Sequence, residues 1–594
     1  MRSRRILPLL LSLVLWPAFA GAAPAASDLA ARREALNKLL AEHWESALAS
    51  NPEFASYLGD KRWNDRLSDA SQAAIDAELA RTREFLTRFE AIDTTGFPEQ
   101  EALNKTLIVR QLREGLEGAR FQPWLMPVNQ IIGFHLEMAQ MPSFLSFESA
   151  KDYQDLIARY RQMPTLFEQQ TANMRKGMAA GLMPPKFLLE KVAVQAEGFA
   201  TAKPEESPYA EPLSRFPDAM PAAERERLRG EVLAAIRESV IPAYARFTEF
   251  LKKEYVPRGR AQVGVSALPD GAARYAFAAK RSTTTDLTPE QIHQIGLREV
   301  ARIEGEMLEV AKKLGFSDLK TFNAAIEKNP EQRAKSGQHL IDLYRQHIDN
   351  MYARLPELFG RLPKAKVEVV ATEAYREKDA SSAEYNPGTP DGSRPGRVMV
   401  NGGEATSRKT FNVESTAYHE GAPGHHLQIA IAQELEGLPP FRQQGGDTVF
   451  VEGWALYSEV LGKEVGFYRD PYSDYGRLQD EMLRAIRLVV DTGLHAKGWT
   501  REQVVQFFRD HSALDDVEVQ SETDRYIVWP GQALAYKIGQ MKILELRERA
   551  RKELGSAFDI RAFHDEVLGA GSLPLDILES RIDAWIARTR TSKA

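Results

Sequence analysis

Helical periodicity alternates with short breaks along most of the chain. Apolar residues recur every three or four positions near the start, at Leu29, Leu36, Leu39, Leu40 and Trp44. Similar patterns predict further helices over residues 99–118, 150–177, 185–199 and 222–256. Thr288 predicts a helix start, because it can cap the helix, Pro289 suits the first position and Gln291 can complete a capping box.

Strand patterns are few and lie between about residues 260 and 400. The runs 366–371 and 397–401 are rich in β-branched residues and predict short strands. Residues 379–397 predict a Gly/Pro/Ser/Asp loop, either a plain surface loop or a substrate lid. Residues 121–147 have weak periodicity and predict an irregular packed segment. The predicted class is therefore mostly α, with one small β-sheet beside the histidine-rich segment 419–426.

The pattern changes near residue 257, and this change predicts two subdomains. We expect an N-terminal helical subdomain at 23–256 and a catalytic subdomain at 257–594, with a deep cleft between the two halves where a ligand can bind. Residues 1–22 predict a signal peptide: basic residues precede an apolar run and a small-x-small cleavage site. The apolar run is short for a membrane span, and no longer run follows. We therefore expect a periplasmic or secreted protein without a membrane span in the mature chain.

The composition of the chain limits its possible partners and metal ligands. The formal net charge of -6, without a long basic run, makes nucleic acid an unfavourable partner. The 594 residues contain no cysteine, which excludes disulfides, a lipid-modified cysteine, and thiolate as nucleophile or metal ligand. Any metal must be held by His, Asp or Glu.

Three histidines fall within eight residues, at His419, His425 and His426, and Glu420 follows the first. Two imidazoles and a carboxylate on one helix are typical of a zinc site, but there the histidines are four residues apart. On a regular helix His425 would point away from His419, and His426 would lie too far along the axis. Pro423 between glycines predicts a loop within the helix. A loop with two extra residues can place His425 on the same side as His419. A loop with three extra residues would place His426 there instead. We favour His425.

Glu452 is the best candidate for a third ligand. It interrupts an apolar run of Val, Phe and Trp, and burial of a carboxylate there is costly unless the group is paired or coordinated. Glu459 lies seven residues later on the same helical face and can orient a ligand.

These stretches resemble a bacterial family catalogued as a domain of unknown function, with an H-E-G-x-P-G-H-H-L-Q signature. The family is distantly similar to the helical zinc oligopeptidases of the thimet oligopeptidase and angiotensin-converting-enzyme type. The resemblance implies a large zincin-like, gluzincin-like helical body holding Zn²⁺ through His419, His425 and Glu452, with Glu420 as general base. It also implies an oxyanion donor in the segment 526–539, with Tyr536 as first choice and Tyr526 as second. The chain departs from the oligopeptidase motif by the insertion Ala422-Pro423.

Three further residues are candidates for substrate contact. Arg525 can pair with a peptide carboxylate, and His426 can contact substrate if His425 is the ligand. His495 shares a helical face with Arg487 and Asp491, although an ion-paired structural face explains that spacing better.

We thus expect an exported zinc metallopeptidase that hydrolyses oligopeptides. The alternatives are a zinc amidohydrolase acting on another substrate, such as a cell-wall fragment, and a catalytically silent binding protein that retains the fold.

Overall fold

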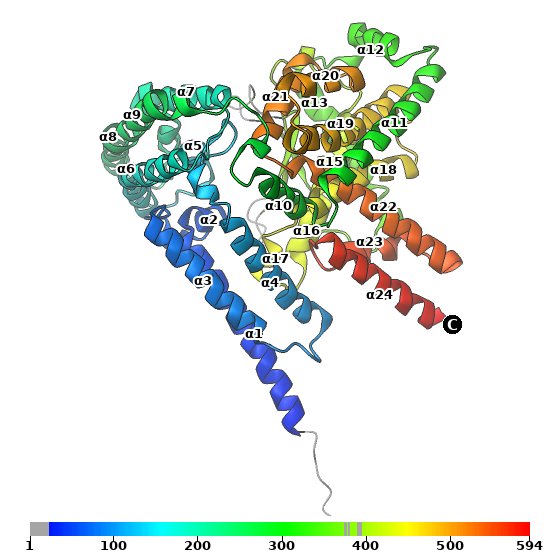
Figure 1. The fold of residues 1–594 in the computed structure, drawn as a ribbon, viewed down its shortest axis with the longest axis horizontal. Coiled ribbons are helices and arrows are strands. Elements are labelled where there is room, and N and C mark those ends of the chain that lie inside the picture. The colour runs from blue at the N-terminus through cyan, green and yellow to red at the C-terminus, as the bar shows by residue number, and fades with distance from the viewer. Residues whose placement is uncertain (1–22, 373–376, 378–380, 389–394, 594) are drawn as a thin grey trace, which may run out of the picture.

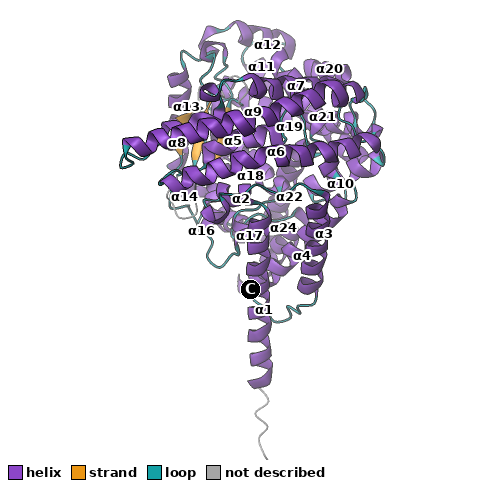
Figure 2. Cartoon of the chain, turned by 90° about the vertical axis from the view of Figure 1, so that its left-hand side faces the viewer, coloured by secondary structure: helices purple, strands orange, loops and turns teal. Residues whose placement is uncertain are grey.

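The computed structural model describes residues 23–372, 377, 381–388 and 395–593. The predicted signal peptide at 1–22 lies outside these residues. Helices make up most of the described chain, and its strands, drawn in orange, are seen behind α8 in Figure 2. In that part of the chain, every helix is too short or too polar to cross a bilayer.

Between residues 23 and 256 the structure describes nine α-helices, and they form the left-hand side of Figure 1. Their bounds are α1 (Ala23–Ser50), α2 (Pro52–Tyr57), α3 (Gln72–Glu90), α4 (Glu99–Ala119), α5 (Phe134–Phe144), α6 (Ala150–Ala179), α7 (Lys186–Thr201), α8 (Ala222–Ala235) and α9 (Ile241–Phe250). The buried residues of one hydrophobic core all lie between Val128 and Tyr255. α4 joins two other cores, because its Ile108 is buried with Leu36 of α1 and Phe89 of α3, and its Leu107 is buried among residues that mainly follow position 279.

The segment predicted to be irregular contains a helix, so that prediction was wrong for residues 134–144. Phe134, His135, Met138 and Met141 of α5 are all buried. A helix that is apolar on most sides shows little amphipathic periodicity in its sequence. Partly exposed positions such as Leu136 are apolar as well, and this hid α5 from the pattern.

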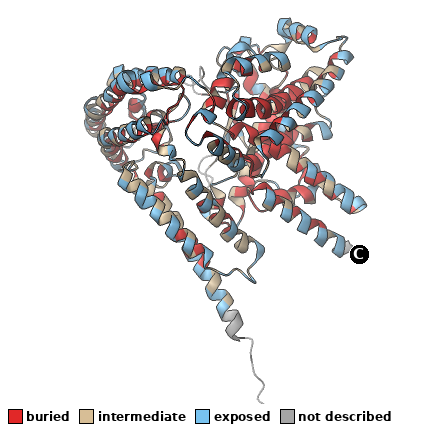
Figure 3. Cartoon of the chain, viewed as in Figure 1, coloured by how far each residue is buried: buried red, intermediate tan, exposed pale blue. Residues whose placement is uncertain are grey.

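The remaining helices form the right-hand side of Figure 1. Their bounds are α10 (Gly271–Thr283), α11 (Pro289–Lys313), α12 (Leu319–Lys328), α13 (Gly337–Tyr352), α14 (Leu355–Leu358), α15 (Val413–Glu420), α16 (His425–Glu434), α17 (Pro440–Gln443), α18 (Thr448–Glu464), α19 (Pro471–Ala496), α20 (Arg501–His511), α21 (Asp516–Val528), α22 (Ala535–Leu554), α23 (Ile560–Leu568) and α24 (Leu575–Lys593). Thr288 and Gln291 form the predicted capping box at the start of α11. Buried positions concentrate on the central helices, among them α19 (Figure 3).

A three-stranded sheet of order β1-β3-β2 joins β1 (Glu368–Ala371), β2 (Ala383–Asn386) and β3 (Arg397–Val400). β3 is central, parallel to β1 and antiparallel to β2, and Val398 lies opposite both Val369 and Tyr385. The strands β1 and β3 confirm the two predicted runs. The prediction of a loop over 379–397 was wrong at β2, because pairing with β3 gives four residues a strand conformation that their own sequence does not favour.

Two glycines allow α18 and α22 to cross in close contact. A Cβ atom on Gly539 would lie 2.0 Å from the carbonyl oxygen of Val449, and one on Gly453 would lie 2.5 Å from the Cα of Gly539. The crossing fixes the helix that carries Glu452 against the helix that carries Tyr536.

A cavity of about 2140 Å³ lies between elements from both halves of the chain. Its wall includes Gln140 of α5, Phe199 of α7, Met399 of β3 and Asp524 of α21. The residues that line it do not include His419, His425 or Glu452.

Candidate metal centre

The helix that carries His419 ends one residue later, as the glycine and proline pattern predicts. α15 stops at Glu420 and α16 begins at His425, with a cis peptide bond between Ala422 and Pro423. Gly424 is required here, because a Cβ atom at that position would lie 2.0 Å from the carbonyl oxygen of His419. Trp454 of α18 donates an indole hydrogen bond of 2.9 Å to the carbonyl oxygen of Pro423. The loop thus displaces α16 and anchors it to α18.

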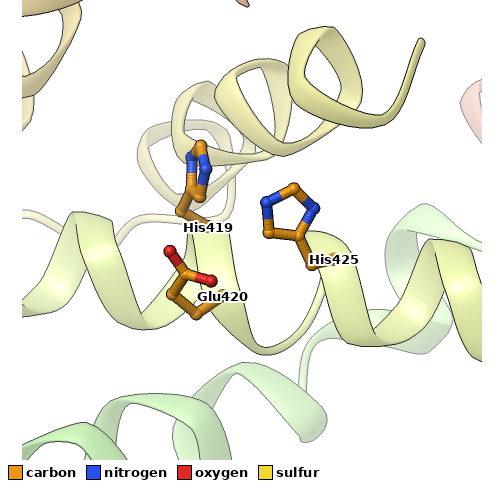
Figure 4. A group of neighbouring side chains, drawn as sticks. All are labelled: His419, Glu420 and His425. Carbon is orange, nitrogen blue, oxygen red and sulfur yellow. The ribbon is translucent and has the colours of Figure 1, made fainter. Parts of the chain in front are cut away.

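This displacement brings His419 and His425 together. Their ring centroids are 4.8 Å apart and their planes are nearly perpendicular, at 88°. Figure 4 shows both imidazoles and the Glu420 carboxylate pointing toward one another. Potential ligand atoms of these three residues all lie within 4.8 Å of each other.

Glu452 of α18 approaches the same point even more closely. Its Oε2 atom lies 3.7 Å from Nε2 of His419 and 3.5 Å from Nε2 of His425. Ligand atoms at about 2.1 Å from a tetrahedral zinc are about 3.4 Å apart. The two distances are close to that spacing, so the two imidazoles and Glu452 can share one ion, while Glu420 stands beside them.

The second nitrogen of His419 is held by Glu459. The Nδ1 atom lies 2.8 Å from Oε1 of Glu459, and both side chains are almost completely buried. The same oxygen is 3.6 Å from a guanidinium nitrogen of Arg484 in α19. Burial lowers the pKa of His419, but Glu452 and Glu459 outweigh it and raise the pKa to about 9. Burial opposes ionisation of Glu452, yet the two histidines hold its pKa well below the ordinary value.

Glu420 is partly exposed and lies next to this group. Burial of its carboxyl raises its pKa, and the neighbouring His425 and His419 oppose that rise. A carboxylate with a raised pKa is suited to accept and return a proton near neutral pH.

His426 points to other partners. Its Nδ1 atom lies 3.1 Å from the Tyr385 hydroxyl, and its Nε2 atom lies 3.0 Å from the carbonyl oxygen of Ala365. Burial lowers its pKa to about 4, so the ring is neutral and both nitrogens are used. The structure therefore brings His425, and not His426, beside His419.

The tyrosines at the start of α22 and the end of α21 differ in their surroundings. The Tyr536 hydroxyl accepts hydrogen bonds from Arg525 at 3.2 Å and from Gln532 at 3.4 Å. The Tyr526 hydroxyl is buried, donates to Glu522 and accepts from Arg487 at 2.9 Å. Burial raises the pKa of the Tyr526 hydroxyl well above its ordinary value. Of the two, Tyr536 has the hydroxyl proton that no described residue accepts.

His495 lies in the interior with both nitrogens in use. Its Nδ1 accepts from the backbone N–H of Val265 at 2.9 Å, so its Nε2–H donates to the carbonyl oxygen of Tyr526 at 2.9 Å. Its neighbour on the face, Asp491, accepts from Tyr275 and from the backbone of Gly531. The helical face that carries Arg487, Asp491 and His495 thus contacts protein groups at each of the three positions.

A family model for a bacterial protein of unknown function, DUF885, matches residues 52–582. The chain belongs to the DUF885 family. A crystal structure of a protein from Colwellia psychrerythraea, described as a proposed lipoprotein, resembles this DUF885 chain with a TM-score of 0.89 and 28% identity, over 94% of this chain and 99% of that one. A proposed lipoprotein of unknown function from Shewanella oneidensis resembles it with a TM-score of 0.72 and 18% identity, over 92% and 99% of the two chains.

No curated protein matches this DUF885 chain. A protein from Bacillus anthracis, described as a proposed oligoendopeptidase F, aligns over 87% of this chain and 97% of its own, at 12% identity and a TM-score of 0.29, which is too low to carry an argument. Both solved proteins are described as lipoproteins. A lipid linked through a cysteine side chain is excluded for these 594 residues, because they contain no cysteine.

Sequence reasoning missed two residues that contact the predicted site residues of this DUF885 protein. Arg484 contacts Glu459, and Glu522 binds both Arg487 and Arg525. The available signals were the position of Arg484 one turn before Arg487 in α19 and that of Glu522 three residues before Arg525 in α21. Glu459 lies on α18 and Arg487 on α19, so the contacts of Arg484 with Glu459 and of Glu522 with Arg487 depend on the tertiary fold, whereas Arg525 follows Glu522 by three residues on α21.

Proposed function

We propose that this DUF885 protein is an exported zinc metallopeptidase that hydrolyses peptide bonds. The observation that carries the proposal is the meeting of the His419 and His425 Nε2 atoms at one oxygen of Glu452, at 3.7 and 3.5 Å. These residues would hold the ion. A zinc ion bound in such a site polarises the substrate carbonyl and lowers the pKa of a bound water toward ~7.

Side chains of this protein would transfer the proton of the attacking water and stabilise the charge that develops on the substrate. Glu420 would take the proton of the attacking water and return it to the leaving amine, for which its raised pKa is suitable. Glu459 accepts the Nδ1 proton of His419 and so leaves the Nε2 lone pair for the ion. Tyr536 would donate its hydroxyl proton to the developing oxyanion, in preference to Tyr526, whose hydroxyl is engaged by Glu522.

Export is part of the proposal. The apolar leader at 1–22 and the description of two similar solved chains as proposed lipoproteins both support a location in the cell envelope. We also propose that the chain consists of two subdomains, 23–256 and 257–594, and that the second contains the catalytic residues.

A Glu420→Gln variant tests the activity. Purified wild-type protein and the variant are each loaded with zinc and incubated with a peptide library, and the products are read by mass spectrometry. We expect the variant to keep its zinc and to lose at least roughly 100-fold in hydrolysis. Equal hydrolysis by the two proteins, or none by the wild type, would overturn the proposal.

A further inference from the structure

Two guanidinium groups share one carboxylate beside Tyr536. Glu522 accepts from Arg487 at 2.9 Å and from Arg525 at 3.2 Å. Burial opposes ionisation of Glu522, but the two arginines outweigh it and lower its pKa to about 2. All three groups are therefore charged at neutral pH, and two positive charges against one negative charge leave an excess of positive charge.

Arg525 is the member of this cluster that can receive a ligand. Its side chain is 23% exposed, whereas that of Arg487 is 6% exposed. It uses one Nη1 hydrogen for Glu522 and both Nη2 hydrogens for Gln532 and Tyr536. The Nε–H and the second Nη1 hydrogen have no acceptor among the described residues. A guanidinium with spare donors and uncompensated charge favours a carboxylate.

Helix α19 places this cluster close to the histidine group. Arg484 lies 3.6 Å from the Glu459 oxygen that binds His419, and Arg487, one turn later, stacks over the Tyr536 ring at 4.5 Å. Three residues of helix rise about 4.5 Å, and an extended peptide advances about 3.3–3.6 Å per residue. The two sites are therefore separated by a distance on the scale of a short peptide.

We propose that Arg525, supported by Tyr536 and Gln532, receives the free C-terminal carboxylate of a peptide substrate, so that the enzyme removes amino acids or short peptides from C-termini. This inference rests on the proposed function and adds its substrate class. Hydrolysis consumes one water, breaks the amide C–N bond and forms a C–O bond, giving a new carboxylate and a free amine. The released fragment carries the carboxylate that Arg525 held.

Binding to the Glu420→Gln protein tests this recognition without turnover. The probes are N-acetyl-tetra-alanine as the free acid and as the C-terminal amide, measured by titration calorimetry. We expect the acid to bind at least roughly 10-fold more tightly than the amide. In the background of Glu420→Gln, a further Arg525→Met change should abolish this preference, and Arg525→Lys should restore part of it.

Arg110→Met is the matched control. Its side chain is also 23% exposed, and it lies on α4, where it pairs with two acids, Glu114 of the same helix and Asp576 of α24. It should leave the preference for the acid unchanged, and thermal unfolding should show every variant folded. Equal binding of acid and amide, or a preference that survives Arg525→Met, would overturn the inference.

Hydrolysis by the wild-type protein separates this inference from the proposed function. Cleavage of the acid but not of the amide supports both. Cleavage of acid and amide at equal rates overturns the C-terminal recognition and leaves the peptidase standing. The absence of cleavage of both probes and of the peptide library overturns both.

Discussion

Glu459 accepts a hydrogen bond from His419, with Oε1 and Nδ1 only 2.8 Å apart and both residues buried. The contact joins α18 to α15 and decides which nitrogen of His419 is free. Because Nδ1 carries the proton that Glu459 accepts, Nε2 is the atom available toward His425 and Glu452.

Replacing Glu459 by Gln should therefore weaken zinc binding by about 10- to 100-fold, the usual effect of losing such an orienting partner. Competition with a chromophoric chelator measures the change. Glu464→Gln on the same helix is the control, because Glu464 pairs with Arg547 away from the histidines. Equal zinc affinity in Glu459→Gln and in wild type would contradict the orienting role.

His425 and His426 should respond differently to substitution by Ala. His425→Ala should remove zinc, whereas His426→Ala should retain it and lose roughly 1–3 kcal/mol of folding stability, because the partners Tyr385 and Ala365 are left unpaired. Elemental analysis and denaturant unfolding give the two readings. Loss of zinc in His426→Ala with retention in His425→Ala would reverse the assignment.

Gly424→Ala should damage both the fold and the metal centre. The new Cβ atom would lie 2.0 Å from the carbonyl oxygen of His419, so the turn must shift, at a cost of roughly 1–3 kcal/mol. We expect a lower midpoint of unfolding together with reduced zinc content. Gly230→Ala in α8 is the control, because nothing lies within 4 Å of its added Cβ atom. A Gly424→Ala protein as stable as this control would show that the turn tolerates a side chain.

Asp491 should make stability fall as the pH rises. Burial raises its pKa to about 7 against the opposing hydrogen bonds from Tyr275 and Gly531, whereas the unfolded value is about 3.9. Between these values the folded protein binds more protons than the unfolded chain, so up to about 4 kcal/mol of stability is lost as the pH rises through this window.

Asp491→Asn removes the titrating group, and thermal unfolding at pH 5 and pH 8 measures its effect. The difference in melting temperature, variant minus wild type, should be more positive at pH 8 than at pH 5. Asp510→Asn on the exposed face of α20 is the control and should show no such trend. A difference that is constant or that reverses with pH would contradict the buried-acid account.

The helical class, the capping box at Thr288 and two of the three strands could be predicted from the sequence, because each depends on local patterns. The same holds for the loop between Glu420 and His425, where Pro423 cannot continue the helix and the glycines allow the turn. β2 could not be predicted, since only its pairing with β3 makes it a strand, and α5 was hidden because its partly exposed positions are apolar as well as its buried ones.

The candidate site divides in the same way. His419, His425 and Glu452 could be proposed from their residue types and their apolar surroundings. The contacts of Arg484 with Glu459 and of Glu522 with Arg487 join different helices, so only the fold reveals them. The burial of His495 against Val265 and Tyr526 is likewise a tertiary property.

A crystal structure of the zinc-loaded protein, with anomalous diffraction recorded on both sides of the zinc absorption edge, tests the central claim most directly. We predict one anomalous peak about 2.0–2.2 Å from Nε2 of His419, Nε2 of His425 and a carboxylate oxygen of Glu452. A peak bound by His426 in place of His425, a peak away from Glu452, or no peak at this group in zinc-saturated crystals would contradict it.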